Sequence, residues 1–377
     1  MQNEIAEFLR QHEQKIEPRW NDYANRFWEM SISGTEDNAK ALSKSKDKYL
    51  QVYSNREEFS KLKSWREAIR DGASVERLTE RQVNVLYDSY VPYQIDESVL
   101  SDMVRRETAI ENVFNTFRPK FEGSLATDNH LRSVLQEETD PQRRRSTWEA
   151  SKQVGGAVAE DLIELVKIRN REAQNLGYRD FYAMHLELQE LDEKWLFRLF
   201  EQLEDVSGDA FVAVKKGLDQ SLRERSGITG TESYPWLYSD PFFQELPAIG
   251  ITETLDAIYQ DCNIEQLTRE HFRNIGLEVD ELIERADLYG REGKSQHAFC
   301  LNVDRMGDVR VLGNIRSDER WMSTMLHEFG HAVYDKYNDP TVPFILREPA
   351  HVLTTEAIAM LNGRMTKTPL WLVRYVE

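Results

Sequence analysis

The segment WMSTMLHEFGHAVYDKY, residues 321–337, carries the strongest structural signal in the sequence. Its apolar residues recur at helical spacing, and Ser317 and Asp318 just before it are residue types that cap a helix. We therefore predict one helix over the whole segment. The apolar face of this helix, which should pack against a core, consists of Met322, Met325, Phe329 and Val333.

The other side of this helix carries the pattern His-Glu-x-x-His at residues 327–331. Residues four apart lie on one helix face with Cβ atoms ~6 Å apart, so two imidazoles can converge on one ion at about 2.0–2.1 Å. Glu328 flanks that point without being a ligand and is placed to hold a water molecule that the metal activates. The pattern predicts that His327 and His331 bind Zn²⁺ and that Glu328 acts as general base.

The same pattern can arise by chance, with two ordinary histidines on a helix. The shared face and the apolar flanks favour the metal, and Gly330 permits a close approach beside the histidines. A catalytic zinc site needs three protein ligands and an open position. A third ligand must therefore come from another element.

Glu356 is the best candidate for this third ligand. It lies in the apolar segment LTTEAIAML, where a carboxylate is costly to bury unless it meets a cation. Glu348 is a rival, but it lies in a Pro-containing loop beside Arg347, which is an obvious alternative partner. His351 is a second rival. The sequence favours Glu356 over both.

The rest of the chain predicts a nearly all-helical fold. Helical periodicity runs from residue 1 to about 225, where Asp140-Pro141 and Asp192 mark helix starts. Residues 226–250 are predicted to form a long loop, and helices resume over 252–290. Period-two patterns at 295–304 and 309–315, with Gly307 between them, predict a β-hairpin. Two further helices are expected, near 350–365 and from residue 369.

Composition narrows the possible functions. The chain has 377 residues, 40% of them apolar, and a net charge of −18. Such acidity repels phosphate backbones and argues against a nucleic-acid partner. The sequence also lacks an apolar stretch long enough to cross a membrane and a recognisable signal peptide, which predicts a cytoplasmic protein without membrane contact. Oligomeric state is left open.

Several conspicuous residues have unremarkable interpretations. With only Cys262 and Cys300, a disulfide framework is excluded. Cys300 is expected to be a buried structural thiol rather than a nucleophile, because no Cys–His arrangement supports catalysis. The basic run at residues 142–145 is expected to be the solvated face of a helix.

The segments HEFGH and LREPAHVLTTEAIAM resemble the gluzincin metallopeptidases, whose fold is helical and two-lobed. The similarity is greatest to angiotensin-converting-enzyme-like dipeptidyl carboxypeptidases, and then to thimet-type and oligopeptidase F-type oligopeptidases. Residues 167–193 and the hairpin around QHAF share it. The resemblance implies zinc, Glu356 as third ligand, and short peptides as substrates. It also implies that His297 and Ala298 belong to an edge strand that binds substrate backbone, although a hairpin that merely covers the core is the alternative.

Two features depart from this family. Met360 stands where the family commonly has an aspartate, so another acceptor, Asp335 or a backbone carbonyl, would have to orient a ligand histidine. The family's transition-state donors, a His and a Tyr, lie well beyond the glutamate ligand, and the chain is therefore expected to be incomplete at its C-terminus. The alternatives are a fragment or pseudoenzyme that binds zinc and peptide without turnover, and a zinc hydrolase of non-peptide amides.

The predicted organisation is one catalytic unit over residues 1–377. Residues 1–125 would form lid-like helices, 126–294 a helical lobe, and 295–377 the zinc-site hairpin and helices. The predicted activity is peptide hydrolysis by an oligopeptidase or a dipeptidyl carboxypeptidase. The sequence does not distinguish between these two.

Overall fold

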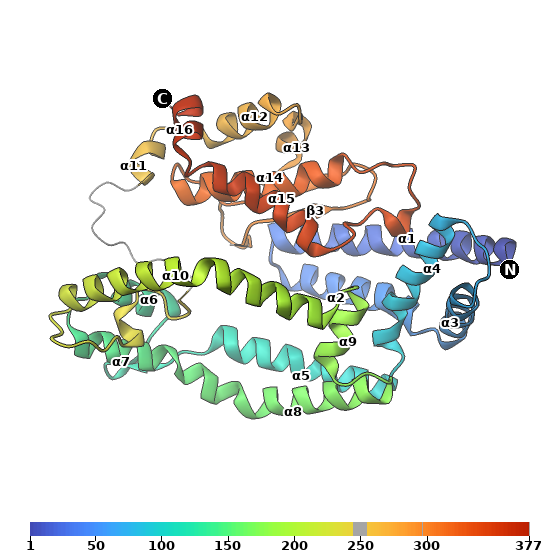
Figure 1. Ribbon diagram of the computed structural model, residues 1–377, viewed down its shortest axis with the longest axis horizontal. Coiled ribbons are helices and arrows are strands. Elements are labelled where there is room, and N and C mark those ends of the chain that lie inside the picture. Colours follow the sequence, from blue (N-terminus) through green and yellow to red (C-terminus); the bar gives the residue numbers. More distant parts are fainter. Residues whose placement is uncertain (244–254, 296, 377) are drawn as a thin grey trace. The chain divides into compact units, whose positions relative to one another are not determined.

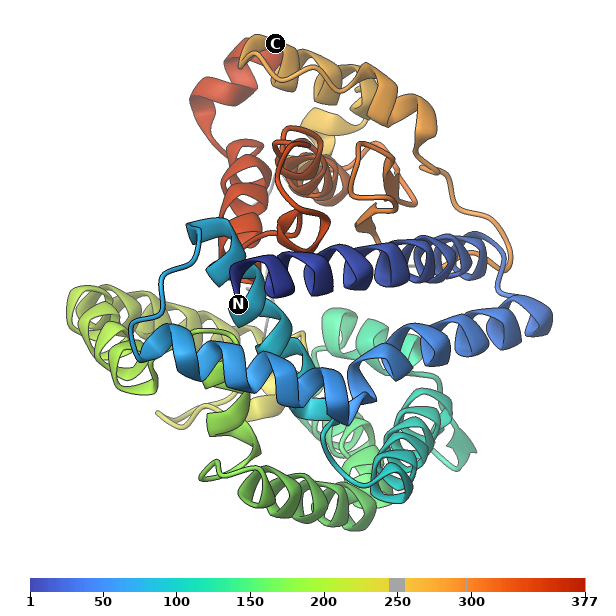
Figure 2. The ribbon, with the colours of Figure 1, turned by 90° about the vertical axis from the view of Figure 1, so that its right-hand side faces the viewer.

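A computed structural model describes residues 1–243, 255–295 and 297–376, leaving aside the side chains of residues 108, 111, 112, 115, 116, 128 and 129. The protein is mainly helical with two small antiparallel sheets, as the sequence predicts (Figures 1 and 2). It forms two compact units, one of Met1–Gln94 with Glu253–Glu377 and the other of Ile95–Thr252. The lid role of residues 1–125 is not tested by this division and stays a prediction.

The first unit begins with helices that build a core of their own. They are α1 (Gln2–Ile32), α2 (Glu36–Leu50), η1 (Gln51–Ser54), α3 (Arg56–Arg70), α4 (Arg77–Tyr90) and η2 (Val91–Tyr93). Ile5, Leu9 and Ile16 of α1 are buried, as the helical periodicity predicted for this part of the chain requires. Ile5 and Leu9 pack with residues of α3 and α4 and with Ile345 from much later in the chain.

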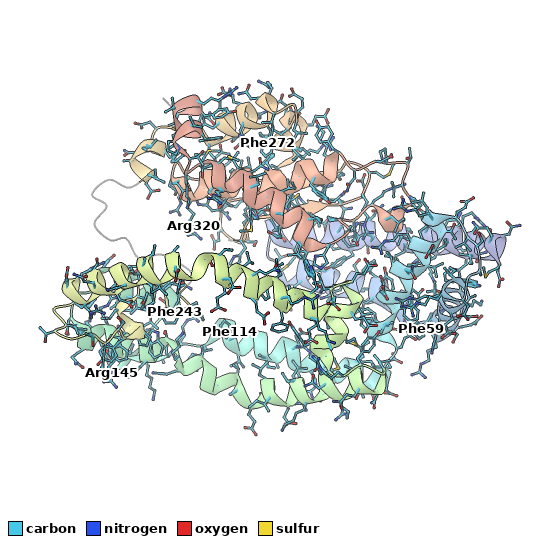
Figure 3. All side chains as sticks on the ribbon, in the orientation of Figure 1. Phe59, Phe114, Arg145, Phe243, Phe272 and Arg320 are labelled. Atoms are coloured by element: carbon cyan, nitrogen blue, oxygen red, sulfur yellow. The ribbon has the colours of Figure 1, made fainter. Side chains whose placement is uncertain are left out.

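The second half of the first unit carries the predicted hairpin and the His-Glu-x-x-His helix. Its elements are α11 (Leu255–Tyr259), α12 (Ile264–Asn274), α13 (Asp280–Arg285), β3 (Phe299–Asn302), β4 (Val309–Leu312), α14 (Glu319–Lys336), η4 (Phe344–Leu346), α15 (Val352–Met365) and α16 (Pro369–Tyr375). The apolar face of α14 lies in the main core with Phe272 of α12 and Trp371 of α16. Figure 3 labels Phe272 within this part of the molecule.

Local sequence explains where α14 begins. The side chain of Asp318 accepts a hydrogen bond from the backbone N–H of Trp321 at 2.7 Å, which is the predicted N-cap. The hairpin forms as expected but with shorter strands, and Gly307 adopts a positive φ of 119° in the turn. Part of the predicted loop 226–250 and the predicted helix start at residue 252 lie outside the described residues.

The second unit is helical and contains one small β-hairpin whose two strands have two residues each. Its elements are α5 (Glu97–Thr116), β1 (Lys120–Phe121), β2 (Ser124–Leu125), α6 (Asp128–Glu137), α7 (Pro141–Ser151), α8 (Gln153–Asn175), α9 (Phe181–Leu188), α10 (Glu193–Arg225) and η3 (Pro235–Leu237). The predicted caps are present: Asp140 accepts from the backbone of Gln142, and Asp192 from that of Trp195.

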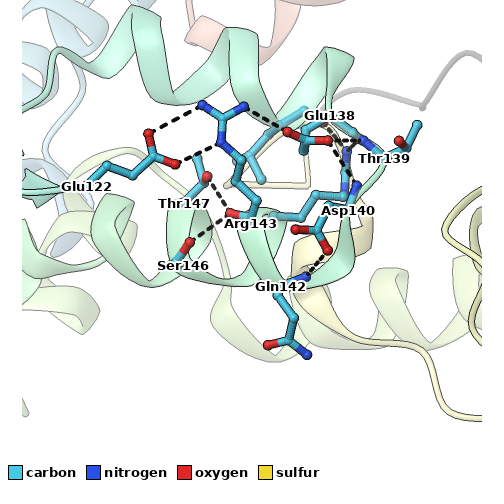
Figure 4. A network of polar contacts seen from close by, with 10 residues as sticks. Glu122, Glu138, Thr139, Asp140, Gln142, Arg143, Ser146 and Thr147 are labelled. Atoms are coloured by element: carbon cyan, nitrogen blue, oxygen red, sulfur yellow. Dashed lines mark hydrogen bonds and ion pairs between the residues drawn. The ribbon is translucent and has the colours of Figure 1, made fainter.

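The basic run in α7 corrects one prediction. Arg143 does lie at the surface, where it bridges Glu122 and Glu138 (Figure 4). Arg144, however, is buried, so the run is not a uniformly solvated face. Its guanidinium donates to the backbone carbonyls of Leu135, Glu138, Trp236, Leu237 and Tyr238. Arg144 therefore ties the start of α7 to the segment around η3, a contact that spacing along the chain does not reveal.

In the described part of the chain, no helix combines the length and hydropathy that crossing a bilayer requires.

Candidate metal centre

The centre begins with two imidazoles on α14. His327 and His331 lie one helical turn apart on the side away from the buried face, and both are half-buried. Their Nε2 atoms are 3.2 Å apart. Both rings thus direct the same nitrogen toward one point, as the spacing of four residues allows.

Helix α15 brings a carboxylate to that point. The Glu356 oxygens lie 3.6 Å from His327 Nε2 and 3.6 Å from His331 Nε2, so the three side chains form a group that could hold a metal ion. Four ligands at about 2.0–2.1 Å from a tetrahedral zinc are separated by about 3.3–3.4 Å. The two nitrogens, 3.2 Å apart, lie close to this value, and each of them is 3.6 Å from a different oxygen of the Glu356 carboxylate. With one ligand atom taken from each residue, the three atoms lie within 4.8 Å of one another. The donor atoms therefore fit zinc in number and in chemistry.

Two glycines allow α14 and α15 to approach closely enough for this. A Cβ on Gly330 would lie 2.8 Å from the Cα of Ala359 on α15. A Cβ on Gly363 would lie 3.1 Å from the carbonyl oxygen of Ser323 and 3.3 Å from the Cβ of His327. The predicted close approach at Gly330 is thus an approach of two helix backbones, and it sets how near Glu356 comes to the histidines.

Behind α15, a buried hydrogen-bonded chain fixes the helix against its neighbours. Trp371 Nε1 donates to His271 Nδ1 at 3.0 Å, and His271 Nε2 lies 2.9 Å from Asn362 Oδ1. The Asn362 amide in turn donates to the carbonyl of Ile358 at 2.8 Å. Because the indole can only donate, the proton of His271 is on Nε2, and every bond in the chain has a defined direction. Burial lowers the pKa of His271, which keeps this ring neutral.

Glu328 lies next to the group but is not part of it. It is buried, and burial raises its pKa to about 7, with the nearby Glu356 carboxylate adding to the effect and a backbone hydrogen bond from Cys300 opposing it. The pKa of His331 is lowered by burial and by His327, against the opposite effect of Glu356. Neutral imidazoles are the form that binds metal ions. The site therefore combines available donors with a carboxyl group able to exchange a proton near neutral pH.

The partner of the second His331 nitrogen is one that sequence reasoning missed. Asp335 or a backbone carbonyl was expected to orient a ligand histidine, but His331 Nδ1 lies 2.7 Å from the hydroxyl of Thr355. Asp335 instead faces other charges: burial raises its pKa to about 7, Glu348 adds to this effect, and Arg305 opposes it. The one signal in the sequence was that Thr355 directly precedes Glu356.

The two rival ligands have other roles in the structure. His351 is the N-cap of α15, and its Nδ1 accepts from the backbone of Leu353 at 2.9 Å. Glu348 pairs with Arg305 in the hairpin turn, so Arg347 was the wrong partner. The side chain of Arg347 instead donates to the carbonyl of Val342.

Arg305 itself could not be identified as important from the sequence. Its guanidinium carbon lies 4.3 Å from the centre of the Trp20 ring and 4.7 Å from that of Phe344, so the cation is held between two aromatic faces. It adopts a positive φ of 55°. Arg305 thereby links the hairpin, α1 and the connection between α14 and α15.

His297 and Ala298 precede β3, which pairs with β4 and packs against α14. His297 is exposed and Ala298 is half-buried. Their part in substrate binding stays a prediction. On the strand itself, burial raises the pKa of the Cys300 thiol, with Asp335 and Glu328 adding to the effect. Cys300 is a free cysteine and is half-buried, so its structural role stays a prediction.

Fold and donor set together define a class of protein. A mainly helical chain with His-Glu-x-x-His on one helix and a glutamate on the next has the ligand types of a single-zinc hydrolase. The family model described as angiotensin-converting enzyme, of peptidase family M2, matches residues 1–221, more than half of the chain. The chain therefore belongs to the angiotensin-converting enzyme family of peptidases, and peptides are its substrate class. The three clustered side chains lie beyond the matched residues, and none of the curated proteins compared with the chain matches it.

Proposed function

We propose that this chain is a zinc-dependent peptidase of short peptides in which His327, His331 and Glu356 hold the metal. The observation that carries this proposal is the convergence of three side chains from two helices beside the buried carboxyl group of Glu328. The two Nε2 atoms are 3.2 Å apart, and each lies 3.6 Å from an oxygen of Glu356. A bound Zn²⁺ would supply Lewis-acid activation of water and of a peptide carbonyl. The family membership supports the same conclusion.

In this mechanism Glu328 moves the proton. Its carboxylate takes a proton from the attacking water and then passes it to the nitrogen of the leaving amine. A pKa of about 7 suits both steps, because the group can accept and return a proton near neutral pH. His327, His331 and Glu356 keep their positions through α14 and α15 and take no part in proton transfer.

For substrate binding we propose the edge of the hairpin. The backbone of His297 and Ala298 would pair with an extended peptide and so add a strand next to β3. This interaction uses main-chain atoms and fits short, extended peptides of varied sequence. Whether the enzyme removes dipeptides from the C-terminus or cuts internally is a separate question, which a peptide with a blocked C-terminus answers: cleavage of such a peptide excludes strict carboxypeptidase action.

The central test compares the wild-type protein with Glu328→Gln. Zinc content is measured by atomic emission after dialysis, and turnover with an internally quenched fluorogenic peptide. We expect both proteins to hold one zinc ion, and kcat of the variant to fall by about 10²–10⁴-fold, because the base is lost while its shape is kept. Removal of zinc by a chelator should abolish wild-type turnover, and added zinc should restore it.

Three outcomes distinguish the alternatives. Full peptidase activity in Glu328→Gln excludes this mechanism. Zinc binding without turnover by the wild-type chain favours a protein that binds zinc and peptide without cutting. Turnover of small amides but not of peptides favours a different zinc hydrolase.

A further inference from the structure

The hydroxyl of Thr355 occupies a specific place beside the candidate metal centre. Its Oγ1 lies 2.7 Å from His331 Nδ1, and the residue directly precedes Glu356 on α15. Threonine hydroxyls within helices commonly bond to a carbonyl of the preceding turn. Thr366, the C-cap residue of α15, does so by donating to the carbonyl of Gly363. Thr355 instead contacts an imidazole on another helix.

The position of each nitrogen of His331 decides which way this bond runs. Nε2 lies 3.2 Å from the Nε2 of His327 and 3.6 Å from Glu356, so Nε2 is the nitrogen that faces the cluster. A nitrogen that binds a cation must offer a lone pair, and the proton of a neutral ring is then on the other nitrogen. With a metal ion at Nε2, His331 Nδ1–H would therefore donate to Thr355 Oγ1.

We propose that Thr355 is a positioning residue that holds His331 with Nε2 toward the metal. This inference rests on the zinc site of the proposed function. It also means that one helix supplies both the third ligand and the group that orients the second, because Thr355 and Glu356 are consecutive on α15. Docking of α15 against α14, through the contact of Gly330 with Ala359, then sets both at once.

The test uses three variants. Thr355→Val keeps the shape of the side chain but removes the hydroxyl, and Thr355→Ser restores it. Thr354→Val is the matched control, because Thr354 directly precedes Thr355 but has other partners. The Oγ1 of Thr354 donates to the carbonyl of His351 at 2.7 Å and lies 3.2 Å from the hydroxyl of Tyr334. Zinc affinity is measured by competition with a chromogenic chelator, and circular dichroism confirms the fold of each variant.

We expect zinc to bind Thr355→Val about 10- to 100-fold more weakly than the wild-type protein, the usual effect of losing a group that orients a ligand. Thr355→Ser should recover most of this loss, and Thr354→Val should match the wild type. Unchanged affinity in Thr355→Val, or an equal loss in Thr354→Val, would overturn the inference.

A second measurement needs no zinc, and its main result comes from the wild-type protein. ¹⁵N NMR of the metal-free wild-type protein at about pH 8, where histidine is ordinarily neutral, reports which nitrogen of each ring carries the proton. His331 should be protonated mainly on Nδ1, and Thr355→Val should shift the proton toward Nε2. A wild-type ring protonated mainly on Nε2 refutes the inference even if Thr355→Val does not fold. Failure of the wild-type protein to bind zinc would instead count against the proposed function.

Discussion

Replacing Gly330 by alanine tests whether the contact between α14 and α15 builds the metal centre. The added Cβ would lie 2.8 Å from the Cα of Ala359 and 3.4 Å from its backbone nitrogen. Real Cβ atoms essentially never come within 3.0 Å of another heavy atom, so this contact must open by at least 0.2 Å (3.0 − 2.8), and by 0.6 Å (3.4 − 2.8) to reach ordinary van der Waals contact. The side-chain amide nitrogen of Asn362 would lie 3.3 Å away, but rotation of a side chain cannot relieve the shortest contact, because the Cα of Ala359 belongs to the backbone.

The expected effect on stability is small because two terms oppose each other. Alanine within a helix is favoured over glycine by about 1 kcal/mol, while overpacking costs about 1–3 kcal/mol. The free energy of unfolding of the metal-free protein should therefore fall by about 0–2 kcal/mol. The effect on the metal is larger, because Glu356 moves with α15 and ligand distances tolerate only about 0.2 Å. We expect zinc affinity to fall at least about tenfold.

The assay pairs urea unfolding of the metal-free protein with chelator competition for zinc. Gly208→Ala is the matched control, since Gly208 lies within α10 and an added Cβ there meets nothing within 4 Å. This control should be more stable by about 1 kcal/mol with unchanged zinc affinity. If Gly330→Ala gained the same stability and bound zinc as tightly as the wild type, the helix contact would not determine the site.

Two further predictions concern the region around Arg305. The pKa of Asp335 is raised from 3.8 to about 7 in the folded protein. Between these two pH values the folded protein keeps a proton that the unfolded chain has lost, so the free energy of unfolding should fall as pH rises from about 4 to 7. Asp335→Asn should reduce this slope, leaving the part that comes from Glu328, whose pKa is also raised to about 7. It should stabilise the metal-free protein at about pH 8 by about 2–4 kcal/mol, measured by urea unfolding, and an equal effect at about pH 5 would contradict the argument. Arg305→Ala removes a cation from between the rings of Trp20 and Phe344 and should lower the free energy of unfolding by about 1–4 kcal/mol. An unchanged midpoint of thermal unfolding would show that the two ring contacts contribute nothing to stability.

Much of the fold was predictable because the signals are local. The helix predicted over residues 321–337 is α14, Glu319–Lys336, and its Asp318 cap and buried apolar face depend on residues within a few turns of one another. The hairpin with Gly307 depends on period-two alternation and one turn. The spacing that brings the Nε2 atoms of His327 and His331 together is likewise a property of a single helix.

Other features depended on neighbours far along the chain. Arg144 was predicted to be solvated, yet it is buried because carbonyls of the segment 236–238 surround its guanidinium. Glu348 was given the wrong partner, since Arg305 reaches it from the hairpin, 43 residues away. No periodicity or capping signal encodes such pairs.

The sequence by itself determined that His327, Glu328 and His331 share one helix and that the two histidines lie on one face of it. It could do so because helix geometry fixes the spacing of side chains that are close in sequence. Only the tertiary structure decided that Glu356, rather than Glu348 or His351, meets the histidine pair, and that Thr355 contacts His331. Those two outcomes depend on the position and rotation of α15 against α14. The close contact of Gly330 with Ala359 and the buried chain from Trp371 through His271 to Asn362 set both.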